Sequence, residues 1–308
     1  MYIQIVIDKL INFMWRVIYQ LSPSPISRRL KTSVPFGAKT TFIKLKNNIM
    51  FDNLDKSEIL KYVFWEGIKG YEFETIQLFC SLVKESDVIF DIGSYIGYFS
   101  IIASKINQDV VIHSFEPVPD NVNLQKHFIK INSCNNIYVH AAAIDLTAAS
   151  KEFFLPDRSK SKFPNIGSLR NRFKAGETFS GRSYKTINVE CYNLDRFVCE
   201  NKINKIDLIK IDTEETEIDV LLSGRKSIQQ YKPDIITEII IRNKSSQEAI
   251  GFLKEFGYKF YEIQSNNLIQ IDEIDDIVNI KMPGRRAYCE LLCSCKNENE
   301  ILMLTEKL

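Results

Sequence analysis

The sequence predicts an α/β protein with a doubly wound, mostly parallel sheet and a helical N-terminal extension. A short, wholly apolar run at residues 88–90 is typical of a strand buried on both faces of a parallel sheet, and similar, mostly apolar runs recur along the chain. Segments of helix length separate these runs, and such strand–helix–strand repeats are the sequence form of a doubly wound sheet. A turn that contains two glycines directly follows the first run and opens a helix.

The apolar runs set the order of the predicted elements. Core strands are expected at residues 88–91, 110–115, 137–140, 206–211 and 234–241. Helices are expected at residues 58–83, 98–105, 121–132 and 217–230. Two later segments, 259–263 and 288–295, alternate in polarity and are predicted to close one edge of the sheet.

The N-terminal segment is apolar, but a polar residue recurs at every fourth position from Gln4 to Gln20. Charges within this stretch argue against a helix that spans a membrane, and the features of a signal peptide are missing. Two interpretations stay open: a helix docked on the main domain, or peripheral membrane contact through residues 1–31. Both keep the protein in the cytoplasm.

Three parts of the chain are predicted. Residues 1–57 form the extension, with a small hairpin at 39–52; residues 58–296 form the main domain, and 297–308 a tail. One stretch of the main domain, 156–185, lacks periodicity and carries eight basic against two acidic residues. This basic segment either folds over the site to recognise a polar or anionic glycan or lipid-linked sugar, or is a solvated loop.

Composition excludes some classes of function. Forty basic and thirty-nine acidic residues give a net charge of +1, so no nucleic-acid partner is predicted. The late cysteines Cys289, Cys293 and Cys295 lack the paired spacing of a zinc site. They are expected in a strand that faces the core, and no metal is predicted there.

The first chemical signal is the pattern D-x-G-x₃-G formed by Asp91, Gly93 and Gly97. Glycine lets the backbone approach a ligand closely, and the helix N-terminus that follows offers free N–H groups to an anion. A dinucleotide fingerprint would need glycines at positions 95 and 98, where Tyr95 and Tyr98 stand. A nicotinamide-dependent oxidoreductase is therefore disfavoured.

The second signal is Glu116, which ends the next predicted strand 25 residues after Asp91. A carboxylate at this place in Rossmann-type sites accepts hydrogen bonds from both ribose hydroxyls. The two signals together predict a ligand that contains a nucleoside.

Three stretches together resemble the FkbM family of S-adenosylmethionine (SAM)-dependent methyltransferases: DIGSYIGYFS at 91–100, FEPVPDN at 115–121 and DLIKIDTE at 207–214. Gly70-Tyr71-Glu72 and Leu194-Asp195 also resemble family positions, and the match runs from about residue 58 to 262. The resemblance implies a Rossmann-like methyltransferase fold and SAM as the donor. It also implies O-methylation of a small-molecule, sugar or glycan hydroxyl, or of another natural product.

The resemblance also implies roles for single residues. Asp91, Gly93 and Gly97 would hold the methionine end of SAM, Glu116 the ribose, and Asp145 would lie near the adenine. The full set of expected cofactor-binding residues is Glu72, Asp91, Gly93, Ser94, Tyr95, Gly97, Tyr98, Glu116, Pro117, Asn121, Ala143, Asp145 and Asp212. Where the family reads D-V-E-G-A-E, this chain reads D-T-E-E-T-E at 212–217, which places Glu215 at a glycine position.

Four residues are candidates for catalysis. Asp212 ends the fourth strand and Glu238 lies in the fifth, and ligands of open α/β sheets bind beyond such strand ends. A carboxylate or a histidine can take the proton of a hydroxyl acceptor, and His140 is the histidine nearest the expected ligand edge. Glu214 either acts at the site or complements a helix dipole, the role favoured for Glu217.

Two alternatives remain open. Asp212 and Glu238 offer oxygen ligands of the kind Mg²⁺ prefers, so a metal-assisted O-methyltransferase is one of them. The other is a non-catalytic binding module with the same fold. The sequence predicts no oligomeric state.

Overall fold

The computed structural model describes residues 14–15, 17–22, 43–156, 167–169, 184–240, 244–265, 267–272 and 288–307. Most of the expected N-terminal helix and most of the basic segment therefore lie outside the described residues. In the described part of the chain, no helix is both long and apolar enough to cross a membrane. The chain divides into two compact units, Met1–Phe73 with His127–Ser133 and Glu74–Lys126 with Cys134–Leu308.

The first unit contains the small hairpin expected within residues 39–52. Its elements are β1 (Ile43–Lys44), η1 (Lys46–Asn48), β2 (Met50–Phe51), η2 (Leu54–Lys56), α3 (Glu58–Glu66) and η3 (Gly67–Gly70). β1 and β2 pair antiparallel, and the Ser57 side chain caps α3 by accepting the Leu60 amide. Tyr19 contacts the end of α3, because its hydroxyl donates to Glu66 at 2.6 Å and its ring lies 5.1 Å from that of Trp65.

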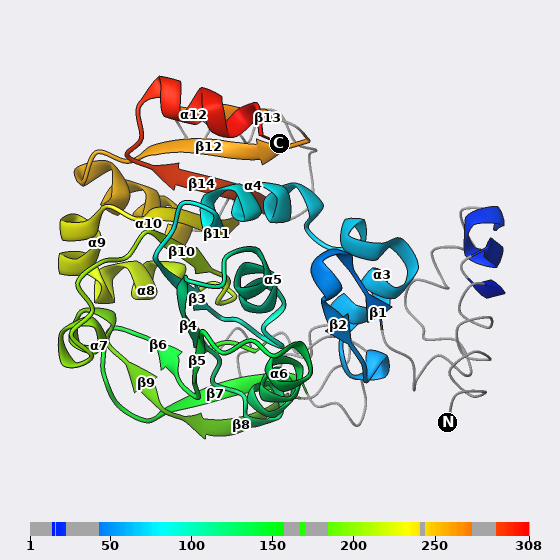
Figure 1. The fold of residues 1–308 in the computed structure, drawn as a ribbon. Helices are drawn as coiled ribbons and strands as arrows, with labels where there is room; N and C mark the ends of the chain where they lie inside the picture. The colour runs from blue at the N-terminus through cyan, green and yellow to red at the C-terminus, as the bar shows by residue number, and fades with distance from the viewer. Residues whose placement is uncertain are drawn as a thin grey trace. The chain divides into compact units, whose positions relative to one another are not determined.

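The second unit is built on a sheet of eight described strands in the order β13-β12-β14-β11-β10-β3-β4-β5 (Figure 1). Their bounds are β3 (Val88–Ile92), β4 (Val111–Phe115), β5 (Ile137–His140), β10 (Leu208–Ile211), β11 (Asp234–Ile240), β12 (Lys259–Gln264), β13 (Asn267–Ile271) and β14 (Tyr288–Ser294). The five neighbouring strands β5, β4, β3, β10 and β11 are parallel, whereas β14 pairs antiparallel with both β11 and β12. In chain order the parallel strands lie 3-2-1-4-5, the order of a doubly wound sheet, so the predicted fold class is confirmed.

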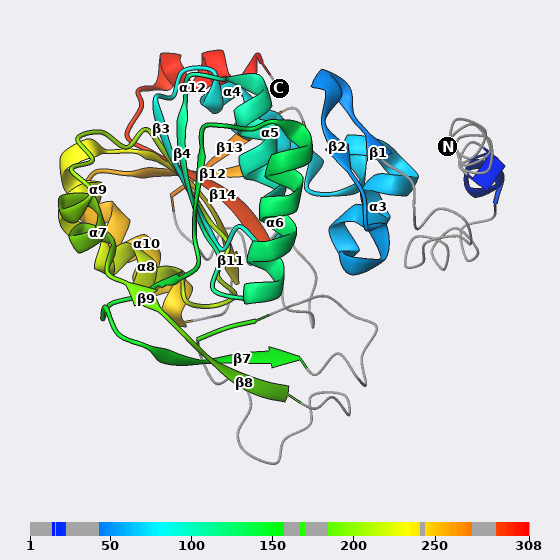
Figure 2. The same ribbon diagram turned by 60° about the horizontal axis from the view of Figure 1, so that its bottom comes forward.

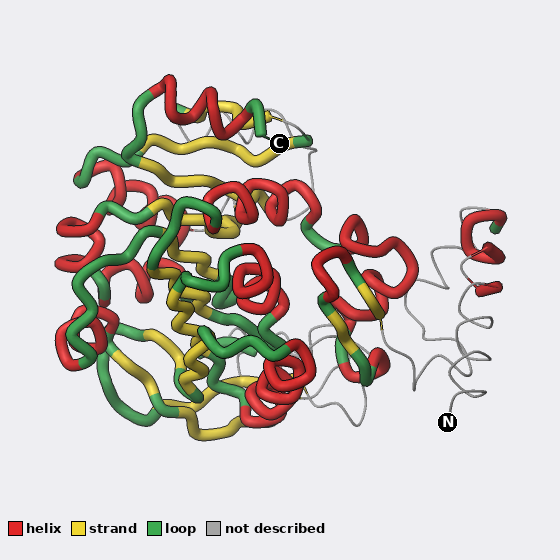
Figure 3. Tube along the Cα trace, viewed as in Figure 1, coloured by secondary structure: helices red, strands yellow, loops and turns green. Residues whose placement is uncertain are grey.

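Helices cover both faces of this sheet (Figures 2 and 3). They are α4 (Phe73–Val83), α5 (Tyr98–Ile106), α6 (Pro119–Asn132), α7 (Leu194–Glu200), α8 (Glu217–Ser223), α9 (Arg225–Tyr231), α10 (Lys244–Glu255) and α12 (Glu298–Thr305). α5 and the first half of α6 lie on one face, and α7 to α10 lie on the other. The core under α7 to α10 joins strand residues such as Phe90 and Ile209 to helix residues such as Leu221 and Leu253.

The helix expected at 217–230 is two helices, and this prediction was wrong in one respect. The break falls at Gly224, where an added Cβ would lie 2.5 Å from Cδ2 of Leu194. Asp195 then caps α9, because its carboxylate accepts the amides of Lys226 at 2.9 Å and Ser227 at 2.8 Å. The Leu194-Asp195 pair thus fixes where the second helix starts.

Between β5 and β10 the chain forms an insertion that the sequence did not predict. Its strands are β6 (Ala143–Ile144), β7 (Lys151–Pro156), β8 (Tyr184–Val189) and β9 (Cys191–Tyr192). β6 and β9 pair parallel, and β7 and β8 form an antiparallel hairpin (Figure 2). The basic segment connects the two strands of this hairpin, so its ends are regular strands and not an irregular loop.

Two of the late cysteines face the core as predicted. Cys289 and Cys293 lie on β14 and are buried in the main apolar core. Cys295 follows the strand and is exposed.

Candidate active site

The glycine turn between β3 and α5 has three residues in the left-handed region: Gly93 (φ 82°), Tyr95 (φ 52°) and Gly97 (φ 76°). A Cβ on Gly93 would lie 1.9 Å from the carbonyl oxygen of Asp212, at the end of the neighbouring strand β10. A Cβ on Gly97 would lie 2.6 Å from Cγ of Gln125 on α6. Close approach of protein groups therefore already requires both glycines, before any ligand is considered.

Hydrogen bonds tie this turn to the end of β4. The amides of Gly93 and Ser94 both donate to the Phe115 carbonyl at 3.0 Å. The Tyr95 amide donates to Oε2 of Glu116 at 2.9 Å. The turn and the ribose-binding acid predicted from the sequence are thus one bonded unit.

Glu116 is 5% exposed and accepts two further bonds. Oε1 takes the Val118 amide at 2.8 Å and the side-chain amide of Asn121 at 3.2 Å. Burial raises the pKa of Glu116 to about 7, although these donors act in the opposite direction. A carboxylate has about four lone-pair sites, so capacity remains for a ligand hydroxyl. Pro117 is the residue that follows Glu116 in the chain.

Two expected cofactor residues lie beneath the turn. The Asp91 carboxylate is 1% exposed, and its Oδ2 accepts the Ser100 amide at 3.1 Å and the Ser100 hydroxyl at 2.5 Å. Burial raises the pKa of Asp91, whereas the nearby Lys210 cation lowers it. Tyr98 is 1% exposed, with its ring 6.1 Å from that of Phe99. Asp91 and Tyr98 therefore hold α5 in place, and their direct contact with SAM stays a prediction.

Asp212 follows β10 and is paired with a buried lysine. Nζ of Lys210 lies 3.1 Å from Oδ2 of Asp212 and 4.3 Å from the centre of the Phe99 ring. The Lys210 side chain is 5% exposed and that of Asp212 is 28% exposed. The pair therefore has its cation in the interior and its carboxylate toward solvent. Lys210 was not among the site residues predicted from the sequence, although a lysine within the otherwise apolar run 208–211 is a signal for it.

The turn after Asp212 keeps a left-handed backbone without glycine, at Glu214 (φ 58°) and Glu215 (φ 77°). Oε1 of Glu217 stabilises it by accepting the Glu215 amide at 3.0 Å and the Thr213 hydroxyl at 3.3 Å. Burial raises the pKa of Glu217. Glu215 thus adopts the conformation that glycine favours.

The insertion also contacts this turn. The Ser168 hydroxyl donates to the Glu214 carbonyl at 2.8 Å, and Ser168 is buried. Ser168 also bridges to Phe154 of β7 through two backbone hydrogen bonds, of 2.9 and 3.2 Å. The β7–β8 hairpin is therefore bonded to the segment that carries two catalytic candidates.

Glu238 lies near Asp212 in the sheet register. Ile211 of β10 pairs with Thr237 of β11, so Asp212 and Glu238 are the next positions along two neighbouring strands. Glu238 in turn pairs with Glu290 of β14. Among the described residues, no group of three or more histidine, cysteine, aspartate or glutamate side chains is placed to hold a metal ion.

The residues expected near the adenine lie in the insertion. Ala143 belongs to a small apolar cluster that also contains Val118, which follows the ribose acid by two positions. Oδ2 of Asp145 accepts the Thr147 amide at 3.1 Å and is paired with the ammonium of Lys151. The contact between Ala143 and Val118 brings the adenine and ribose candidates into one region.

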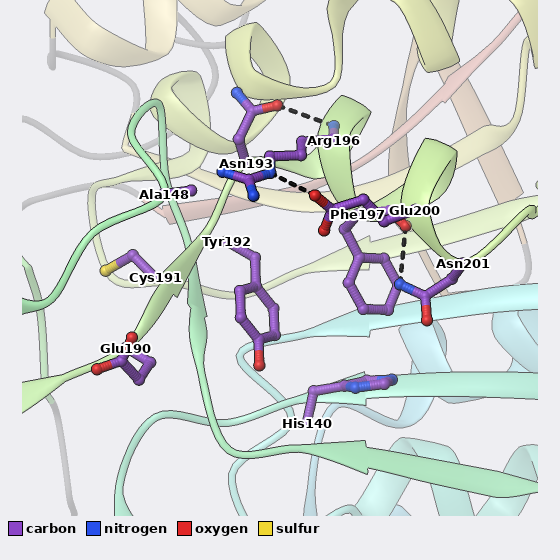
Figure 4. Close-up of a pocket in the computed structure, with 10 residues that line it drawn as sticks. All are labelled: His140, Ala148, Glu190, Cys191, Tyr192, Asn193, Arg196, Phe197, Glu200 and Asn201. Carbon is purple, nitrogen blue, oxygen red and sulfur yellow. Dashed lines mark hydrogen bonds and ion pairs between the residues drawn. The ribbon is translucent and has the colours of Figure 1, made fainter.

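His140 lies beside Glu116, whose amide donates to the His140 carbonyl at 3.1 Å, and away from the acids at the ends of β10 and β11. It lines a pocket of about 400 Å³ beside α7, and Figure 4 shows the ring of Tyr192 directed toward it. Its Nε2 lies 3.1 Å from Nδ1 of His113, and burial lowers the pKa of His140 to about 4. Three strand spacings separate β5 from β10, or about 14 Å. The structure therefore does not bring His140 together with Asp212 or Glu238.

Glu72 belongs to the first unit, just before α4, and has a left-handed backbone (φ 39°). Its expected contact with the cofactor stays a prediction.

A doubly wound sheet with a glycine turn after its first strand and an acid after its second has the architecture of SAM-dependent methyltransferases. The family model described as Methyltransferase FkbM domain matches residues 91–260, more than half of the chain. The chain therefore belongs to the FkbM family of SAM-dependent methyltransferases.

Known relatives are distant. The 31-O-demethyl-FK506 methyltransferase FkbM of Streptomyces tacrolimicus is 22% identical over 199 residues, which cover 57% of this chain and 74% of that protein. A crystal structure of methyltransferase FkbM from Methylobacillus flagellatus KT has a TM-score of 0.42 at 11% identity, covering 80% of this chain and 56% of that one. An O-methyltransferase from Bacillus cereus has a TM-score of 0.37 at 11% identity, covering 71% and 79%.

Proposed function

We propose that this methyltransferase methylates a hydroxyl oxygen of a sugar, a glycan or another natural product, and that Asp212 receives the hydroxyl proton. The observation that carries the proposal is the placement of Asp212. Its carboxylate reaches solvent at the carboxyl end of β10, while its backbone touches the glycine turn. The name of the Streptomyces relative, a 31-O-demethyl-FK506 methyltransferase, supports an oxygen acceptor.

The cofactor residues would act mainly by orientation. The turn from Gly93 to Gly97 would hold the methionine end, Glu116 the ribose and Asp145 the adenine. SAM, when bound, supplies a methyl group on a positively charged sulfur. In-line displacement at such a group gains up to about 7–11 kcal/mol from correct placement of the reactants in the best cases.

A neutral hydroxyl must also lose its proton. Asp212 is one acceptor for it, and Glu238 lies at the next strand end in register. Lys210 holds Oδ2 of Asp212, which directs the other oxygen to the acceptor. Glu214, in the adjoining turn, is the third candidate.

The test uses SAM with an isotopically labelled methyl group and a panel of sugars, polyketides, amines and thiols. Mass spectrometry locates the label in the product. We expect label on oxygen, and we expect Asp212→Asn to reduce turnover by about 10²–10⁴-fold, the usual contribution of a general base. Glu255→Gln, a change at an exposed ion pair between α9 and α10, is the control.

Label on nitrogen, sulfur or carbon would overturn the acceptor class. If Asp212→Asn keeps full turnover and Glu238→Gln loses it, the general base is Glu238 on β11 and not Asp212. Turnover in the presence of a chelator separates metal-free transfer from transfer assisted by Mg²⁺, for which Asp212 and Glu238 are the expected ligands.

A further inference from the structure

Lys210 is a buried cation that the proposed reaction leaves without a direct chemical role. All four residues of β10 are buried, and the side chain of Lys210 is 5% exposed. Lysine is almost never fully buried unless it is paired, because removing an ammonium from water costs several kcal/mol. Lys210 meets this condition through its ion pair with Asp212.

The charge lies between acids of two strands. Lys210 pairs in register with Asp91 of β3 and lies 3.1 Å from Asp212 at the end of its own strand. The Phe99 ring of α5 lies 4.3 Å from the ammonium on a third side. The neighbour of Lys210 on β11 is the apolar Ile236, so among the described residues of β3, β10 and α5 the cluster consists of Lys210, Asp91, Asp212 and the Phe99 ring.

The cluster adjoins the cofactor site. The Asp212 carbonyl meets the backbone of Gly93, and Glu116 lies on the opposite side of the same turn. In the order β10-β3-β4, a ligand with its ribose at Glu116 and its methionine end at the turn extends toward β10. A methyl donor bound in this orientation would have its sulfur on the β10 side of the glycine turn, the side on which Lys210 pairs with Asp212.

We propose that Lys210 opposes the positive charge of the methyl donor and so favours methyl transfer over retention of SAM. During transfer the bond between sulfur and the methyl carbon breaks, and its electron pair stays on sulfur. A bond forms between that carbon and the acceptor oxygen, whose proton passes to Asp212. The sulfur thus changes from positive to neutral, and a fixed cation nearby disfavours only the first state.

The inference rests on the proposed cofactor site. It does not require the acceptor to be identified, because only the destination of the proton depends on the acceptor. SAM and its demethylated product, S-adenosylhomocysteine, are suitable probes, because they differ at the sulfur by one methyl group and one charge. Calorimetry on the whole chain gives the ratio of their dissociation constants. We expect Lys210→Met to shift this ratio about tenfold in favour of SAM.

Two variants complete the experiment. Asp212→Asn removes a negative charge from the same cluster and should shift the ratio toward the product. It also tests the proposal if Lys210→Met fails to fold. Lys232→Met, at a lysine 5.5 Å from the Phe256 ring and away from the site, should leave the ratio unchanged.

An equal loss of affinity for both ligands in Lys210→Met would show a purely structural role and would overturn the proposal. An unchanged ratio, or a shift toward the product, would overturn it as well. A wild-type protein that binds neither ligand would overturn the cofactor site itself, which distinguishes the two failures. A hydroxyl acceptor that proves wrong leaves the ratio experiment unaffected.

Discussion

Binding of SAM should become weaker as the pH falls through about 7, because Glu116 must be ionised to accept a ribose hydroxyl. Burial raises the pKa of Glu116 to about 7 in the free protein. About nine-tenths of the carboxyl groups are then ionised at pH 8 and about one-tenth at pH 6. If only the ionised form binds, the apparent affinity falls about tenfold between these pH values, or about 1.4 kcal/mol.

The assay is calorimetry with S-adenosylhomocysteine at pH 6, 7 and 8 and constant ionic strength. Glu116→Gln should remove the pH dependence. It should also weaken binding, because both carboxylate oxygens accept backbone amides and one of these would face the new side-chain NH₂. Glu217→Gln, at another buried acid of raised pKa, should keep the dependence. Affinity that stays constant from pH 6 to 8, or an unchanged dependence in Glu116→Gln, would refute the reasoning.

The same acid has the opposite effect on stability. Folding raises the pKa of Glu116 from 4.5 to about 7, so the folded state holds the proton more tightly than the unfolded state. The resulting stabilisation is complete below pH 4.5 and is lost as the pH rises through about 7. It amounts to about 3 kcal/mol in total. Chemical unfolding of wild type and Glu116→Gln across this range measures it, and parallel pH curves would contradict it.

Three further substitutions test the structural account by thermal unfolding of the ligand-free protein. Gly93→Ala should cost about 2–5 kcal/mol, because a Cβ there meets the Asp212 carbonyl and the backbone is left-handed; a fully stable variant would contradict this. Lys202→Gly, at an exposed residue with a left-handed backbone (φ 54°), should stabilise by about 1 kcal/mol, since relief of this conformation exceeds the added chain entropy; a loss of stability would contradict it. Asp195→Ala should destabilise by about 1–2 kcal/mol through loss of the α9 cap, and an unchanged melting temperature would exclude that role.

The parallel core of the fold was predictable because each of its strands is a short, mostly apolar run, a pattern that can be recognised without knowledge of the partner strand. The insertion was not, because β6 and β9 have two residues each and exist only through pairing with one another. The break at Gly224 likewise depends on contact with Leu194, a residue 30 positions earlier. Local patterns carry no information on such contacts.

For the site, the sequence predicted that the glycine turn and Glu116 act together, and their hydrogen bond supports this. Gly93 was predicted to allow close approach of a ligand, whereas the structure shows that a Cβ there would already meet the Asp212 carbonyl. Loss of binding after a large substitution there would reflect the clash with β10 and not contact with the ligand alone. The rule that sites lie at strand ends applies to His140 as well as to Asp212, but only the strand order reveals that three spacings separate them.

The hairpin of β7 and β8 leaves and rejoins the sheet domain at one place, since Lys151 pairs with Val189 and Ala149 bonds to Cys191. Such a segment has the properties of an exchangeable cassette. A chimera that takes residues 151–189 from another family member therefore keeps the order of the eight described strands of the main sheet. The hydrogen bond from Ser168 to Glu214 sets the condition for a functional chimera, because an incoming cassette must supply an equivalent donor.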